Sequence, residues 1–392
     1  MSDSLTPAER RIGASLAAIF GLRMLGLFLI FPVFAPHASE LAGGDNLMLV
    51  GIALGAYGLT QACLQIVWGM ASDRWGRKPV IFAGLLLFAF GSAVAALSTT
   101  IEGVIAGRIL QGAGAISAAV TALAADLIRE EQRTKVMAMI GASIGLVFAG
   151  SLVIAPLLYG VAGLSGIFWL TGALALGAML LLRFAVPNPP PPVPAPPVPL
   201  ALVLRDAQLA RLNFGVFVLH LTQTALWMLV PAALVQEGGL AVARHWQVYL
   251  PAVLLSFVVM TPAVIVAEKK GRMKQVFAGA ILLLLCALAG LAFAGQGVWS
   301  LAFWLTLFFA AFNILEATQP SLISRIAPPQ AKGKALGLYN TLQAIGLFVG
   351  GSLGGVLLQT LGGGAVYALC AGFCFIWLCL SRQIVVPPRR AI

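Results

Sequence analysis

Long apolar stretches of about 20 residues recur along the whole chain, and they constrain the fold more than any other feature. A helix of that length crosses the hydrocarbon core of a bilayer, which is about 30 Å thick. With 60% hydrophobic and 9% charged residues, the chain carries too much apolar surface for a water-soluble domain. We therefore expect an all-α integral membrane protein. The sequence predicts twelve spans, at residues 13–35, 47–69, 79–99, 103–128, 135–160, 165–186, 212–236, 245–267, 276–295, 298–325, 333–358 and 363–381.

The basic residues predict the orientation of these spans. Of the 24 Lys and Arg residues, Arg23 and Arg108 lie within spans, and only Arg244 lies in a connection on one side. The others flank the opposite side, together with both termini. Basic residues concentrate on the cytoplasmic side, so we expect a multi-pass protein of the inner (plasma) membrane with both termini in the cytoplasm. The net charge of +11 then reflects orientation, and no nucleic-acid partner is expected.

The start of the chain has an alternative interpretation as a cleaved signal. Arg10 and Arg11 precede an apolar run, as in a twin-arginine signal, with Ala35 to Ala38 as a cleavage region. The run from Ile12 to Phe34 is longer than a typical signal core and contains Arg23. We therefore expect an uncleaved first helix.

A proline-rich segment at residues 187–199 divides the chain. Such a density of proline excludes helix and favours an extended polyproline II strand. We predict an N-terminal six-helix bundle (residues 12–186), a proline-rich cytoplasmic linker (187–211) and a C-terminal six-helix bundle (212–386). The halves repeat one feature, because Glu268 to Lys274 follow the eighth span as Asp73 to Lys78 follow the second.

The connection between the second and third spans carries the most informative motif, Gly69-Met70-Ala71-Ser72-Asp73-Arg74-Trp75-Gly76-Arg77-Lys78. It resembles the loop 2–3 signature of major facilitator superfamily transporters, with Ala71 in place of the usual leucine. Arg108 to Ala115 likewise resemble the superfamily motif R-x-x-Q-G-x-g. The resemblance implies two pseudo-symmetric six-helix bundles with a site near the membrane midplane.

Further motifs resemble particular branches of that superfamily. Gly26 to Pro36 are similar to the first-helix signature of twelve-helix drug/proton antiporters. The antiporter motif of the fifth span is degraded, since Ala155 and Tyr159 replace glycines. Residues 22–26, 57–62 and 213–215 resemble the YajR branch, whose extra soluble C-terminal domain we expect this chain to lack.

The charged connection suggests a conformational latch. Asp73 is expected to reach the N-terminus of the eleventh span near Lys332 to Ala335, where unpaired N–H groups and the helix dipole attract a carboxylate. Arg77 is expected to pair with Asp126 at the end of the fourth span. The alternative is that these charges only anchor loops and orient the protein. The predicted latch comprises Gly69, Asp73, Arg74, Gly76, Arg77, Lys78 and Asp126.

Ionisable residues inside spans are costly and point to function. Glu316 is the first candidate for proton coupling; alternatively it pairs statically with Arg108 or Arg23, or solvates a packing seam. Arg108 matches a motif residue that the superfamily is thought to use in coupling, and it would tune a nearby acid or a bound anion. Arg23 has the same two interpretations as Arg108, coupling or helix-to-helix hydrogen bonding. His220 titrates in the useful range, although a packing role is more common for such a histidine.

A substrate cavity needs apolar walls with a few polar groups. Several polar and aromatic residues of the spans are candidates, although each one alone is more often a packing residue. The predicted cavity residues are Tyr57, Gln61, Gln65, Gln111, Phe148, Gln223, Trp227, Asn313, Tyr339, Asn340 and Gln343.

Other chemistries lack support in the sequence. Gly141 to Gly145 match G-x-S-x-G, but they lie inside an apolar helix rather than at a strand-turn-helix elbow. There is no ATP-binding loop motif, so we expect neither an enzyme nor a cofactor or metal. The five cysteines lie in predicted spans and are interpreted as packing residues: Cys63, Cys286, Cys370, Cys374 and Cys379.

The sequence thus predicts a proton-coupled secondary transporter that works by alternating access and exports small apolar or amphipathic compounds. A facilitator or importer of a small metabolite is one alternative, and a transport-inactive sensor or assembly factor is another. The expected partners are a small-molecule substrate, protons and the lipid bilayer, and the expected state is a monomer.

Overall fold

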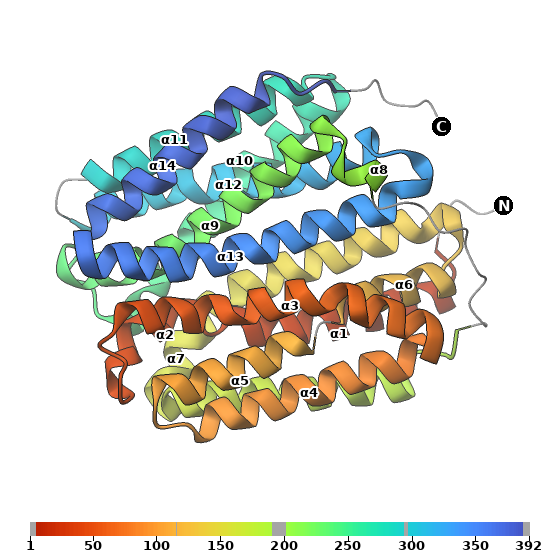
Figure 1. Cartoon of the computed structure of the whole chain (residues 1–392), viewed down its shortest axis with the longest axis horizontal. Coiled ribbons are helices and arrows are strands. Elements are labelled where there is room, and N and C mark those ends of the chain that lie inside the picture. The colour runs from red at the N-terminus through yellow and green to blue at the C-terminus, as the bar shows by residue number, and fades with distance from the viewer. Residues whose placement is uncertain (1–4, 115, 190–200, 294–296, 387–392) are drawn as a thin grey trace. The chain divides into compact units, whose positions relative to one another are not determined.

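The computed structural model describes residues 5–114, 116–189, 201–293 and 297–386, and Figure 1 shows their helices. These residues form no β-strand, and an isolated bridge joins Ala42 and Thr100. The all-α prediction is therefore confirmed. The first half contains α1 (Pro7–Phe28), α2 (Phe31–His37), α3 (Leu47–Trp75), α4 (Arg77–Leu97), α5 (Ile101–Ala113), α6 (Ser117–Leu127) and α7 (Glu130–Phe184). The second half contains α8 (Ala201–Leu204), α9 (Ala207–Gln236), α10 (Trp246–Lys269), α11 (Met273–Phe293), α12 (Val298–Ile326), α13 (Lys332–Leu361) and α14 (Gly363–Ser381).

In the part of the chain that the structure describes, the predicted spans correspond to 11 stretches of helix that are long and apolar enough to cross a membrane. One of them accounts for the fifth and sixth spans together. Helix α7 has 55 residues and would measure about 80 Å, far more than one bilayer crossing. It is broken at Gly163, whose φ of 62° is favourable only for glycine. The break lies between the two predicted spans, so α7 is long enough for two crossings.

Two predicted spans are interrupted, which corrects the expectation of continuous helices. The first divides between α1 and α2, because Pro32 lacks an N–H and crowds the preceding turn. The fourth divides between α5, which ends at Ala113, and α6, which begins at Ser117. Here Gly112 and Gly114 pack against neighbouring backbone. An added Cβ on either one would lie 2.2 Å from a carbonyl oxygen, of Tyr57 or Gly84 respectively.

The chain forms two compact units. The first comprises residues 5–45 and 56–189 of the described chain, and in it α1 packs against α7 while α4 packs against α5 and α7. The second comprises residues 46–55 and 201–386, with α9 against α13 and α12 against α10 and α11. The start of α3 belongs to the second unit because its glycines allow close approach to α13. A Cβ on Gly51 would lie 2.0 Å from the carbonyl oxygen of Gly351.

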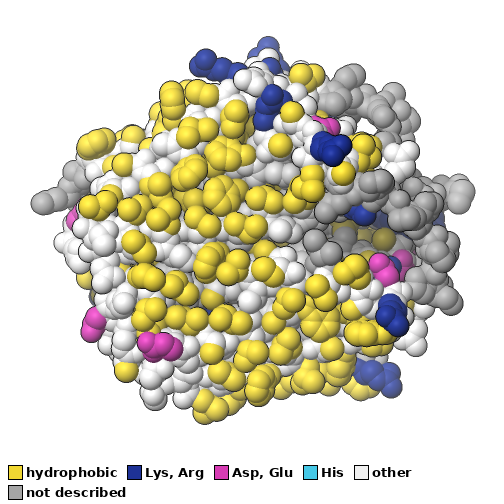
Figure 2. Space-filling model, in the orientation of Figure 1, with side chains coloured by type: hydrophobic (Ala, Val, Ile, Leu, Met, Phe, Trp, Pro, Cys, Tyr) yellow, Lys and Arg dark blue, Asp and Glu magenta, His cyan; other side chains and the backbone are white. Residues whose placement is uncertain are grey.

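The outer surface of the helices is suited to lipid. Hydrophobic side chains cover much of the face shown in Figure 2, and charged ones lie toward its margins. Exposed apolar side chains occur on helices of both units, for example Phe90 on α4, Val258 on α10 and Phe375 on α14. In lipid these side chains need no protein cover, so this surface is consistent with the predicted membrane spans.

The cysteine prediction is only partly right. All five cysteines are free, and Cys370 and Cys374 are buried as expected. Cys63, Cys286 and Cys379 are exposed, because their positions on α3, α11 and α14 face outward from the packed helices.

The predicted linker is only partly described by the structure. Its residues 190–200 lie outside the described residues. Helix α9 begins at Ala207, within the range assigned to the linker, because the side chain of Asp206 accepts hydrogen bonds from the N–H groups of Gln208 and Leu209.

The contact between α4 and α5 predicts which glycines are needed for packing. In Gly107→Ala the new Cβ would lie 2.6 Å from the backbone nitrogen of Ala95, so we expect overpacking to cost about 1–3 kcal/mol. Thermal unfolding of the purified protein in detergent measures the loss. The control is Gly177→Ala in α7, where the described chain places no heavy atom within 4 Å of the new Cβ. Equal effects of the two changes would contradict the predicted contact.

Candidate functional site

Two buried arginines of the first unit lie around one tyrosine ring. Arg23 of α1 and Arg108 of α5 are each only 1% exposed. Their Cζ atoms lie 5.6 and 4.9 Å, respectively, from the ring centroid of Tyr57 on α3. Such cation–π contacts contribute about 2 kcal/mol when desolvated. The ring therefore offsets part of the cost of burying two positive charges.

The two guanidinium groups donate to neutral side chains. Nη1 of Arg23 donates to Oγ of Ser117 at 3.0 Å, and Nη2 donates to Oε1 of Gln61 at 2.8 Å. Nη1 of Arg108 donates to Oε1 of Gln111 at 2.8 Å. The predicted residues Arg23, Tyr57, Gln61, Arg108 and Gln111 thus form one cluster, which we call the arginine cluster.

A hydroxyl network extends the arginine cluster to α4 and α7. Nε2 of Gln111 donates to Oγ of Ser92 at 2.8 Å, and Oγ1 of Thr171 donates to the same oxygen at 3.0 Å. Neither Ser92 nor Thr171 was predicted, because a lone hydroxyl residue in an apolar span gives no signal until its neighbours are known. The network connects α4, α5 and α7 through buried hydrogen bonds.

A second cluster, in the second unit, is centred on His220 of α9. Its Nδ1 lies 3.0 Å from the carbonyl oxygen of Val216, and its Nε2 lies 2.7 Å from Nε2 of Gln343 on α13. Oε2 of Glu316 on α12 lies 3.6 Å from the same Nε2. A carbonyl only accepts, so we assign the ring hydrogen to Nδ1; the neutral ring then accepts from Gln343 through Nε2. We call His220, Glu316 and Gln343 the histidine cluster.

Aromatic side chains surround the histidine cluster. The rings of His220 and Phe312 lie 5.6 Å apart, nearly perpendicular. Tyr339, on the same helix as Gln343, is buried. The side chain of His220 is 5% exposed and that of Glu316 is 39% exposed, so a charge on His220 gains more from a nearby partner than it would in water.

The other predicted cavity residues divide between the two units. In the first, Gln65 is buried on α3, and the ring of Phe148 lies 5.1 Å from that of Phe28. In the second, Nδ2 of Asn313 donates to Oγ of Ser256 at 2.7 Å, and Asn340 is partly exposed. Gln223 and Trp227 line a cavity with room for about one water. In this conformation that cavity is too small for a substrate.

The predicted charged connection forms a network in the first unit. Gly76 has φ of 93° and so allows the sharp turn from α3 to α4. Nε of Arg77 donates to Oδ2 of Asp126 at 2.8 Å, which confirms the predicted pair. Arg77 also pairs with Asp73, and Nζ of Lys78 donates to the carbonyl oxygen of Val186 at 2.8 Å. The network therefore connects α3, α4, α6 and the end of α7.

The second unit contains a counterpart that was not predicted. Glu268 at the end of α10 pairs with Arg325 at the end of α12, and Oγ of Ser321 donates to Glu268 at 2.9 Å. The contact lies at the corresponding end of its unit, but Glu268 corresponds to Asp73 and not to Arg77, since each acid lies three residues before the glycine of the turn, Gly271 or Gly76. The repeated acidic and basic connection after the eighth span was the available signal, but its partner on α12 was not identifiable.

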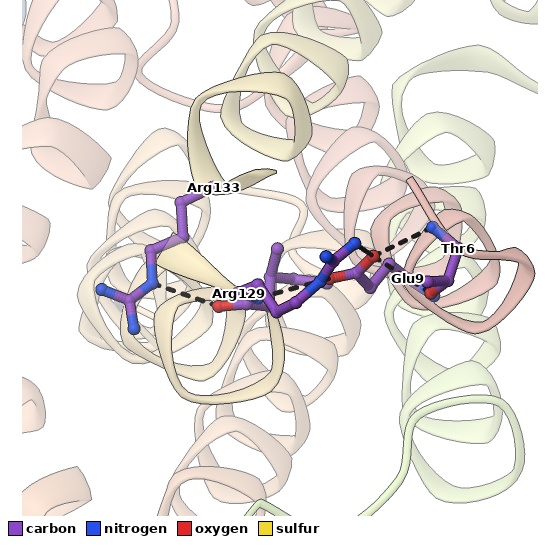
Figure 3. A network of polar contacts seen from close by, with 5 residues as sticks. Thr6, Glu9, Arg129 and Arg133 are labelled. Carbon is purple, nitrogen blue, oxygen red and sulfur yellow. Dashed lines mark hydrogen bonds and ion pairs between the residues drawn. The ribbon is translucent and has the colours of Figure 1, made fainter. Parts of the chain in front are cut away.

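A third charged contact holds the start of α1 to the connection between α6 and α7 (Figure 3). Nε and Nη2 of Arg129 each donate to one oxygen of Glu9 at 2.8 Å. Glu9 also accepts from the backbone N–H of Thr6, which caps α1. This bidentate pair was missed, because Glu9 and Arg129 are 120 residues apart.

These observations define a polytopic α-helical protein with ionisable clusters inside its spans, as in membrane transporters. The family model described as the Major Facilitator Superfamily matches residues 16–210 and 212–391. The chain therefore belongs to the major facilitator superfamily and is a membrane transporter.

Individual relatives agree with this assignment. The chain is 42% identical over 394 residues to the inner membrane transport protein YajR of Escherichia coli, covering 99% of this chain and 86% of that protein. It is 27% identical to the multidrug resistance protein MdtH of Photorhabdus laumondii, covering 85% and 82%. A crystal structure of a bacterial homologue of the human lysosomal transporter Spinster, inward-facing and occupied, has a TM-score of 0.76. It covers 97% of each chain at 13% identity, which shows the fold alone.

The network around Arg77 predicts unequal effects of removing its two carboxylates. The Asp126 side chain is 26% exposed, whereas that of Asp73 is 65% exposed. Exposed ion pairs contribute about 0–1 kcal/mol. We expect Asp126→Asn to lower the thermal unfolding temperature and Asp73→Asn to leave it nearly unchanged. A larger loss in Asp73→Asn would contradict the order given by burial.

Proposed function

We propose that the chain is a proton-coupled antiporter that works by alternating access and exports small apolar or amphipathic compounds. The histidine cluster is the observation that carries the proposal. It places a titratable imidazole beside a carboxylate inside the spans of the second unit, with a 3.6 Å separation between Nε2 of His220 and Oε2 of Glu316. Such pairs inside membrane proteins commonly form proton relays.

Protonation changes the hydrogen bonds that His220 can form. The neutral ring accepts at Nε2 from the amide of Gln343, which lies 2.7 Å away. Once Nε2 holds a proton it can only donate, so the amide of Gln343 is no longer a suitable partner. The carboxylate of Glu316 then becomes the favourable neighbour. A proton arriving at this cluster therefore exchanges one contact between α9 and α13 for one between α9 and α12.

The substrate class follows from the surroundings of the clusters and from the relatives. Polar groups are sparse among buried aromatic side chains such as Phe312 and Tyr339, which favours compounds with a large apolar part. One relative is named as a multidrug resistance protein. We propose that the chain lies in the inner membrane with both termini in the cytoplasm, because basic residues concentrate on that side of the spans. We propose that it acts there as a monomer.

The charged network at the turn between α3 and α4 is proposed to act as a conformational latch on the cytoplasmic side. Arg77 bridges Asp73 and Asp126, so breaking either contact loosens the ends of α3, α4 and α6. The segment is completed by four more residues. Gly69 leaves the surface of α3 open to close approach, Gly76 forms the turn, and Arg74 and Lys78 add positive charge. The latch would bias the transporter toward one conformation and release as the bundles rock.

The proton-coupling proposal predicts the effect of Glu316→Gln. Purified protein is reconstituted in liposomes with an internal pH dye and challenged with candidate substrates under an imposed proton gradient. We expect substrate-dependent proton flux in the wild type and a loss of at least tenfold in Glu316→Gln, since the amide cannot exchange a proton.

The matched control is Glu237→Gln, an exposed glutamate after α9. We expect this variant to retain wild-type flux. Substrate transport at a rate independent of the proton gradient would support a facilitator instead. Equal flux in Glu316→Gln and the wild type would reject Glu316 as the proton carrier.

The latch proposal predicts lower transport rates in Asp73→Asn and Asp126→Asn at normal amounts of protein in the membrane. We expect losses of about three- to tenfold, because the conformational equilibrium shifts by about 1 kcal/mol when such a contact is lost. Flux in the same liposomes measures the effect. Unchanged rates in both variants would leave these residues only an anchoring role.

A further inference from the structure

We propose that Arg23 and Tyr57 form a subsite for the anionic head group of the substrate, which makes the transported compounds amphipathic anions. This inference rests on the proposed transport function and names the class of compound that it serves. It starts from the charge of the arginine cluster, which the proton mechanism at His220 and Glu316 does not use.

The charge of Arg23 is buried without a counter-charge in the described part of the chain. Among the described residues its hydrogen bonds reach Oγ of Ser117 and Oε1 of Gln61, which are neutral acceptors. Nε has no hydrogen-bond partner, and no carboxylate of the described residues lies within ion-pair distance. An unpaired buried charge is costly. An anion bound beside Arg23 would remove this cost and use the idle N–H.

Tyr57 adds a second unused donor at the same place. Its side chain is 1% exposed, and its hydroxyl has no hydrogen-bond partner among the residues that the structure describes. The Cζ atoms of both guanidinium groups lie within 5.6 Å of the centroid of the Tyr57 ring. A hydroxyl beside buried cations donates most favourably to an anion.

The break in the fourth span contributes a third positive element. Helix α6 has 11 residues and begins at Ser117, whose Oγ lies 3.0 Å from Nη1 of Arg23. Its N-cap residue, Ile116, forms no side-chain cap hydrogen bond. A helix N-terminus inside a membrane span carries partial positive charge, and broken helices direct such ends at anionic substrate groups. Arg23 and the start of α6 therefore favour the same sign of ligand.

The surroundings of the arginine cluster fit an apolar tail. The ring of Tyr57 lies 6.3 Å from that of Phe88, edge to face. In the described part of the chain, the polar contacts beside this ring include those of the guanidinium groups and of the hydroxyl network. A compound with one anionic group and an apolar body would satisfy both parts, whereas a cation would face two buried arginines.

The test is equilibrium binding to the full-length protein in lipid nanodiscs without a proton gradient. The probes are two matched pairs, naphthalene-1-acetate with its amide and octanoate with octanamide. We expect each carboxylate to bind at least tenfold more tightly than its amide, because hydrogen bonds to a charged group are the stronger ones. In Arg23→Gln we expect that preference to fall below about twofold, and in Tyr57→Phe to fall by about three- to tenfold.

The control variant is Arg183→Gln, an exposed arginine at the end of α7 in the same unit, which should keep the wild-type preference. If Arg23→Gln does not fold, Tyr57→Phe decides alone, because it removes only the hydroxyl. Equal binding of acids and amides to the wild type, no binding of either acid, or an unchanged preference in the variants would overturn the subsite. Binding needs no proton gradient, so the two proposals can fail separately. Loss of the acid preference with proton flux intact would reject the subsite and leave the antiporter proposal standing. An acid preference without substrate-dependent proton flux would reject proton coupling and leave the subsite standing.

Discussion

The cost of placing a polar group in hydrocarbon controls this structure. Backbone groups offset this cost by hydrogen bonding within helices, and polar side chains inside the spans offset it by hydrogen bonding to one another. Hydrogen bonds among Gln111, Ser92 and Thr171 join three helices of the first unit. The charge of Arg23 is compensated only in part, since its hydrogen-bond partners Ser117 and Gln61 are neutral. A transporter can use such incomplete compensation, because a ligand or a proton then supplies what the protein lacks.

Each unit has a charged pair at one end of its helices. Arg77 pairs with Asp126 in the first unit, and Glu268 pairs with Arg325 in the second. Each pair joins the region where the second span of its unit turns into the third, at Arg77 or Glu268, to the end of the fourth span, at Asp126 or Arg325. The acid lies on the later span in the first unit and on the earlier span in the second, so the halves share the place of the contact and not the residues that form it. The clusters of polar residues inside the spans differ more, with arginines in one unit and a histidine and carboxylate in the other.

Breaks in the helices coincide with the sites of interest. Gly112 and Gly114 allow backbone packing so close that α5 ends and α6 begins beside Arg23. The start of α6 offers backbone N–H groups that a continuous helix would have paired within itself. Gly76 similarly permits the turn that brings Arg77 to Asp126. Glycine is used here for close approach and for positive φ, and both uses position charged groups.

The sequence alone determined the membrane-spanning fold, because apolar length and basic connections report directly on transfer from water to lipid. It also predicted the pair of Arg77 with Asp126, since the start of the third span and the end of the fourth face the same side of the membrane. It did not predict that Glu9 meets Arg129, that Ser92 and Thr171 extend the arginine cluster, or that His220 lies between Gln343 and Glu316. Those contacts join residues far apart in the chain, and nothing local to a span states which helix packs against it. Only the tertiary structure decided them, because helix rotation and packing depth set which polar groups meet.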